Sequence, residues 1–67
     1  MGDWNDTKEE RARLYGEAIL RNPGSTEFIV LLDIINILEH RYHVSSHLSG
    51  AFAAGIIKEF YDDSRTF

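Results

Sequence analysis

An apolar run in the middle of the chain constrains the fold more than any other feature. From Phe28 to Leu38 every residue is apolar except Asp33 and Asn36, in a chain of 67 residues. At about 100° per residue, a helix of this sequence has apolar side chains on all but a narrow stripe of its surface. Such a helix must be covered on most sides, and so short a chain has few residues with which to cover it.

A strand is the alternative structure for this run, because its first residues are rich in β-branched and aromatic side chains. The run is longer than one ordinary strand, however, and no second segment has the pattern of a partner strand. We therefore expect a helix from about residue 26 to about residue 42, with Ser25 or Thr26 as its N-cap.

Two further helices are predicted on either side of this run. The first should span about residues 6–21, with Asp6 as N-cap and Glu9 completing a capping box. Its apolar face comprises Ala12, Leu14, Tyr15, Ala18 and Ile19, and its expected ion pairs are Glu9 with Arg13 and Glu17 with Arg21. The segment Asn22-Pro23-Gly24-Ser25 then breaks the chain. A turn before Ser46 leads to a third helix, from about residue 46 to about residue 62, with Ser45 or Ser46 as N-cap.

The third helix has two unlike faces. One carries bulky apolar side chains and is expected to pack on the helix of the apolar run. The other carries small side chains, although each glycine lowers helix propensity by about 1 kcal/mol relative to alanine. This small face either receives another helix at short range or is a tolerated exposed surface. The bulky face comprises Leu48, Phe52, Ala53, Ile56, Ile57 and Phe60, and the small face comprises Ala51, Ala54, Gly55 and Lys58.

These elements predict an all-α fold, a small three-helix bundle that forms one domain over residues 1–67 with a short frayed C-terminal tail. A domain of this length buries only about 60% of the surface that its unfolded chain exposes, so its stability is marginal. Either packing within the chain completes the burial of the central helix or, as we expect, a second copy does so in a symmetric helical dimer.

The composition excludes several kinds of site. The chain has no cysteine, which excludes disulfides, thiolate metal ligands and thiol nucleophiles. Its net charge is −4 and no basic face is apparent, which argues against nucleic-acid binding. The first residues lack a secretory pattern, and the apolar run is shorter than the roughly twenty residues of a membrane span. We therefore expect a cytoplasmic protein without a membrane segment.

The three histidines lie close together in the sequence, at His40, His43 and His47. If the helix of the apolar run continued through them, they would share a face and could bind a divalent metal with Glu39 or Asp33. The predicted turn takes His47 off that face. The competing interpretation is a polar stripe near a helix C-terminus, which would make an interface sensitive to pH where histidine titrates. On this interpretation no metal or other cofactor is expected.

Two other classes of function can be weighed against the sequence. Serine, histidine and acidic residues occur near one another, but neighbours on one short turn rarely form a catalytic triad, and so small a bundle has little room for a substrate pocket. We expect no enzymatic activity.

The outline of helix, turn and helix is typical of DNA-reading motifs, which normally present basic and amide side chains. Here the third helix would present Ser46, His47, Ser49 and Gly50 instead.

The sequence thus favours a small acidic protein-interaction module, a regulator or inhibitor that binds a partner protein, such as a nucleic-acid-handling protein with a basic surface. The alternatives are a divalent-metal-binding protein and a helix-turn-helix DNA-binding regulator. Trp4 and Tyr42 are the expected aromatic anchors of the interface. The other expected contact residues are Asp33, Asn36, Glu39, His40 and His43 on the polar stripe, and Ala51, Ala54, Gly55, Lys58 and Asp62 on the small face.

Overall fold

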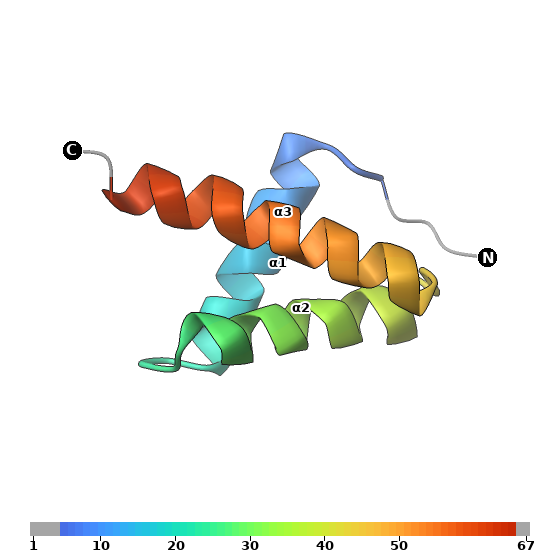
Figure 1. The fold of residues 1–67 in the computed structure, drawn as a ribbon, viewed down its shortest axis with the longest axis horizontal. Coiled ribbons are helices and arrows are strands. Elements are labelled where there is room, and N and C mark those ends of the chain that lie inside the picture. Colours follow the sequence, from blue (N-terminus) through green and yellow to red (C-terminus); the bar gives the residue numbers. More distant parts are fainter. Residues whose placement is uncertain (1–4, 66–67) are drawn as a thin grey trace.

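The computed structural model describes the backbone of residues 5–65 and the side chains of residues 5–61. In this part of the chain there are three helices and no strand: α1 (Lys8–Arg21), α2 (Glu27–His40) and α3 (Ser46–Arg65). They pack into a small bundle in which α3 runs beside α2 and α1 crosses both (Figure 1). The predicted all-α three-helix fold is confirmed for the described residues.

The core lies between the three helices and is aliphatic. Leu14, Ile34, Leu38 and Ile56 are its largest fully buried apolar side chains, and together they represent all three helices. Each buried side chain of this size contributes about 1.5–3 kcal/mol. The largest share comes from α2, so the apolar run supplies the core as expected. The complete buried apolar set is Leu14, Ala18, Val30, Ile34, Ile37, Leu38, Ala53, Ile56 and Ile57.

The first helix begins later than predicted and has a different cap. Thr7 is the N-cap, and its hydroxyl oxygen accepts a hydrogen bond from the Glu10 N–H at 3.1 Å. Asp6, the predicted cap, instead pairs with Arg11 at 2.9 Å. Aspartate and threonine are both good N-caps, so the local pattern alone does not distinguish the two neighbours.

One of the two ion pairs predicted along α1 is confirmed. Glu17 and Arg21 approach to 3.6 Å. Arg13, however, pairs with Glu10 at 2.6 Å and not with Glu9. Residues three and four apart are both neighbours on a helix surface, so either glutamate is within reach of this arginine. On the predicted apolar face of this helix, Leu14 and Ala18 are buried, Tyr15 is half-buried, and Ala12 and Ile19 are exposed.

The second helix ends at His40, two residues before its predicted end. Thr26 is confirmed as its N-cap. After the helix, His43 has a φ of 57°, in the left-handed region where helices commonly end. The Val44 N–H then donates to the Leu38 carbonyl oxygen at 2.9 Å, which closes the turn. The helix therefore does not continue through the three histidines.

The third helix is capped by Ser45, as expected, and continues three residues beyond its predicted end, to Arg65. Its rotation about its own axis differs from the prediction. Ser49 is fully buried, whereas Leu48, which was assigned to the bulky face, is 48% exposed. The Ser49 hydroxyl donates to the Val44 carbonyl oxygen at 3.2 Å, so this buried polar group keeps a hydrogen bond. The other residues of the bulky face pack in or against the core: Phe52, Ala53, Ile56, Ile57 and Phe60.

Candidate protein-interaction surface

One side of α2 is left uncovered by the rest of the chain. Phe28, Ile29 and Leu32 expose 62%, 41% and 42% of their surface. Leu32 follows Ile29 by three residues and Phe28 by four, so it lies next to both on the surface of the helix. The apolar run therefore contains more apolar surface than the three helices of a single chain enclose.

An apolar groove lies beside this face, between the beginning of α2 and the second half of α3. Its volume is about 530 Å³. Ile57 is buried and Leu31 is half-buried, so the groove is continuous with the core. We call it the α2–α3 groove; it is lined by Glu27, Phe28 and Leu31 of α2 and by Ala54, Ile57, Lys58 and Tyr61 of α3.

The apolar surface continues from the groove onto α1. A second hollow of about 150 Å³ shares Glu27, Ile57 and Tyr61 with the groove and is also lined by Tyr15 and Ile19 of α1. Ile19 and Tyr61 are each 39% exposed. All three helices thus contribute to one apolar surface.

Opposite charges stand on the two walls of the α2–α3 groove. Glu27 is on the α2 wall and Lys58 is on the α3 wall, and both side chains are exposed. Neither forms an ion pair with another residue among those whose side chains the structure describes. The groove is therefore locally neutral, although the chain as a whole has a net charge of −4.

The small face of α3 points outward. Ala51, Ala54, Gly55 and Lys58 are all exposed, and two of them, Ala54 and Lys58, line the groove. A Cβ atom added at Gly55 would meet nothing within 4 Å. The described part of the chain therefore needs no small residue at position 55 for its own packing. Asp62 belongs to this helix, but its side chain lies outside the described ones, as does Trp4.

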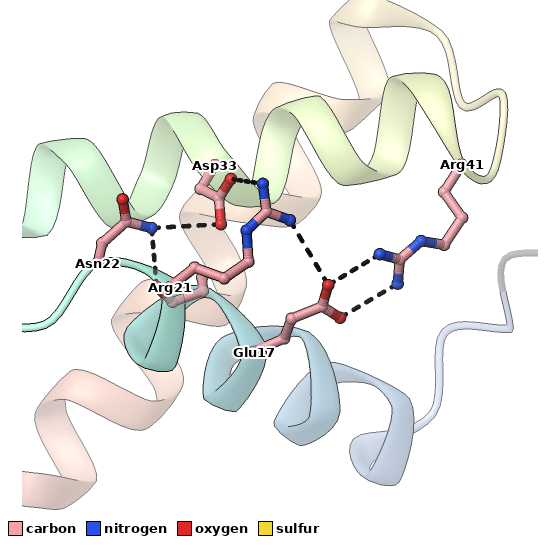
Figure 2. Close-up of polar contacts among 6 residues, drawn as sticks. Glu17, Arg21, Asn22, Asp33 and Arg41 are labelled. Carbon is pink, nitrogen blue, oxygen red and sulfur yellow. Dashed lines mark hydrogen bonds and ion pairs between the residues drawn. The ribbon is translucent and has the colours of Figure 1, made fainter.

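The polar stripe of α2 is partly engaged within the chain. Asp33 Oδ1 lies 3.3 Å from Arg21 Nη2, and Asp33 Oδ2 accepts a hydrogen bond from Asn22 Nδ2 at 3.3 Å (Figure 2). Asn36 and His40 remain exposed, and Glu39 is half-buried. A polar hollow of about 340 Å³ lies on this flank and is lined by Arg21, Asp33, Asn36, Ile37, His40 and Arg41.

Arg41 holds the end of α2 against α1, a role that the sequence did not indicate. Its guanidinium donates two hydrogen bonds to the Glu17 carboxylate, at 3.1 and 2.8 Å (Figure 2). These hydrogen bonds are the main reason why the pKa of Glu17 lies below its usual value; burial acts in the opposite direction. The two residues are 24 positions apart, so no local spacing predicts their contact.

Tyr42, expected as an interface anchor, makes its contacts within the chain. Its ring is half-buried and packs against the core. Its hydroxyl donates a hydrogen bond to Glu10 Oε2 at 2.7 Å, and this carboxylate raises the pKa of Tyr42. The residue therefore ties the turn after α2 to the beginning of α1.

The structure does not gather the three histidines. His40 ends α2, His43 lies in the left-handed turn, and His47 is in the first turn of α3. Among the described residues, no group of three or more histidine, aspartate and glutamate side chains could hold a metal ion. The continuous helix on which the metal hypothesis depended is absent from this segment.

The second alternative, a helix-turn-helix reader of DNA, meets a different difficulty. The order of α2, turn and α3 is present. However, Ser49, one of the four residues that the start of α3 would offer to bases, is buried and bonded to a backbone carbonyl. A side chain used in this way is not available to read a base edge.

Comparison with protein families, with curated proteins and with solved structures finds no match to this chain. None of the helices in the described residues combines the length and the apolar character that crossing a membrane requires.

Proposed function

We propose that this chain is a small protein-interaction module, a regulator or inhibitor that acts by binding a partner protein and performs no chemistry of its own. The observation that carries this proposal is the apolar surface centred on the α2–α3 groove. Contiguous exposed apolar surface on a small protein commonly marks a contact with another polypeptide. Phe28 at the rim of the groove is suited to anchor such a contact, since interfaces are enriched in aromatic residues.

In this proposal the module is a symmetric dimer, and its polar flank faces the regulated partner. A second copy would cover apolar surface that the single chain leaves open. Asn36 and His40 are exposed on the flank of α2 away from the groove, so they stay accessible. The net charge of −4 favours a partner with a basic surface, such as a protein that itself handles nucleic acid.

Capture followed by direct binding tests the proposal. The immobilised chain is exposed to an extract of the organism that encodes it, and mass spectrometry identifies what is retained. The purified candidate is then titrated by calorimetry against the wild type, Phe28→Ser and Asn36→Arg. Glu9→Lys, an exposed change on α1 outside both surfaces, is the control.

We expect Asn36→Arg to raise the Kd for the partner about tenfold or more, with the control unchanged, because Asn36 lies on the flank that faces the partner. Phe28→Ser should instead weaken the dimer. Circular dichroism establishes that each variant keeps its helical content. A chain that sediments as a monomer and binds no purified protein directly contradicts the proposal.

A further inference from the structure

We propose that the α2–α3 groove is the docking site of a second copy of this chain, with Phe28 of each copy against the groove of the other and Glu27 of each copy paired with Lys58 of the other. The inference rests on the proposed interaction function and deepens it, since it names the surface and its occupant. Three observations carry it: the shape of the groove, its charges and the extent of the apolar surface around it.

The shape of this surface is self-complementary. Phe28 projects from the α2 wall with 62% of its surface exposed. On the α3 wall, the exposed residue Ala54 has only a small side chain and leaves the groove open. A two-fold interface uses the same patch on both copies, so a projection and a hollow side by side fit their own two-fold mates. Phe28 of one copy then fills the hollow of the other.

The charges of Glu27 and Lys58 are also self-complementary under two-fold symmetry. A two-fold axis that runs along the groove sets Glu27 against Lys58 of the second copy and, at the same time, Lys58 against the other copy's Glu27. Both charges lack an ion-pair partner among the described side chains of their own chain. A basic partner helix would face repulsion from Lys58, and an acidic one would face repulsion from Glu27. A second copy satisfies both charges.

Exposed apolar side chains extend beyond the groove itself. A stable interface buries about 800 Å² per partner, so a dimer has to cover the groove together with the surface around it. The groove is lined by two helices, and further exposed apolar side chains lie outside it. They are Ile19 on α1, in the second hollow that shares Tyr61 with the groove, and Ile29 and Leu32 on α2.

The test is a charge-exchange series measured by sedimentation equilibrium of the whole chain at low salt. Glu27→Lys sets a lysine against Lys58 of the second copy, and Lys58→Glu sets a glutamate against Glu27. Each single variant should raise the dimer Kd about tenfold or more, because two attractive pairs become repulsive. The double variant should return to the wild-type Kd. An equimolar mixture of the two single variants should form heterodimers in preference to homodimers, since both pairs are then attractive.

Matched controls separate this effect from a change in net charge. Glu9→Lys and Lys8→Glu make the same charge changes on exposed residues of α1 that do not line the groove, and they should leave the dimer Kd unchanged. Ala54→Arg places a bulky side chain on an exposed position of the groove and should weaken the dimer at every salt concentration. Thermal melting establishes that each variant is folded.

The outcomes distinguish this inference from the proposed function. A dimer that neither the charge exchanges nor Ala54→Arg weakens overturns the assignment of this surface and leaves the interaction function standing. A chain that stays monomeric up to about 1 mM overturns the second copy as occupant. If that monomer binds a purified partner through Phe28, the groove belongs to the partner and the interaction function stands. If it binds none, both proposals fail.

Discussion

The carboxylate of Glu17 accepts two hydrogen bonds from the guanidinium of Arg41, at 3.1 and 2.8 Å, across 24 positions of sequence. This contact fastens the C-terminal end of α2 to the middle of α1. Arg21 and Asp33 make a second connection between the same helices, at 3.3 Å (Figure 2). These polar contacts lie on one flank of α2, and the α2–α3 groove lies on the other. The helix that carries the exposed apolar surface is therefore bonded to α1 on the flank opposite that surface.

A double-mutant cycle on Glu17 and Arg41 should measure how much their contact contributes to the free energy of unfolding. We expect Glu17→Gln and Arg41→Gln each to lower the free energy of unfolding by about 0.5–1 kcal/mol, because two-point guanidinium–carboxylate pairs are the stronger ion pairs of partly exposed surfaces. The coupling energy from urea unfolding should be of similar size, at about 0.5 kcal/mol. Arg13→Gln, whose side chain is 67% exposed, is the control. Additive effects in the cycle would refute this contribution.

The same contact should make the stability of the chain depend on acid pH. The pKa of Glu17 in the folded chain lies below its ordinary value of 4.5, so the unfolded state binds a proton more readily. The stabilisation is therefore complete above that value and is lost as the pH falls through the folded pKa. Urea unfolding at a series of pH values should show a smaller loss below about pH 4.5 in Glu17→Gln than in the wild type. Equal slopes in both proteins would exclude Glu17 as a source of the pH dependence.

The hydroxyl of Ser49 should stabilise the folded chain, although serine is not a favoured residue inside a helix. Its hydroxyl is the partner of the Val44 carbonyl oxygen, and the residue is fully buried. Ser49→Ala should cost about 1 kcal/mol in the free energy of unfolding, because a buried carbonyl loses its hydrogen bond. Ser46→Ala, an exposed change one helical turn earlier, should stay within about 0.5 kcal/mol of the wild type. Equal stabilities of the two variants would contradict this role.

Replacing His43 by glycine, in the turn between α2 and α3, should stabilise the folded chain. His43 has a φ of 57°, which costs a residue with a Cβ atom about 1–2 kcal/mol. His43→Gly removes this strain but loses some of the gain to the greater freedom of the unfolded chain, so we expect about 0.5 kcal/mol of net stabilisation. His47→Gly, in the first turn of α3, should destabilise by about 0.3–0.5 kcal/mol. Thermal melting of both variants checks the opposite signs, and a loss of stability in His43→Gly would contradict the argument.

Local patterns were sufficient to predict the three helices and three of their six ends. Thr26 and Ser45 cap the helices for which they were proposed, and the break at Pro23 and Gly24 separates α1 from α2. These features act between neighbouring residues, so they can be recognised without the rest of the molecule. The error at the start of α1 arose where Asp6 and Thr7 are both competent caps.

Contacts between helices could not be predicted in the same way. Leu48 and Ser49 are adjacent and about 100° apart on the helix, so a modest rotation of α3 exchanges which of them is buried. That rotation results from fitting all three helices around one core, as does the meeting of Glu17 with Arg41. That α2 keeps exposed apolar surface was foreseeable from the run itself, because so few residues are there to cover it. Its position beside Lys58 emerged only when the helices packed, since packing determines which faces remain open.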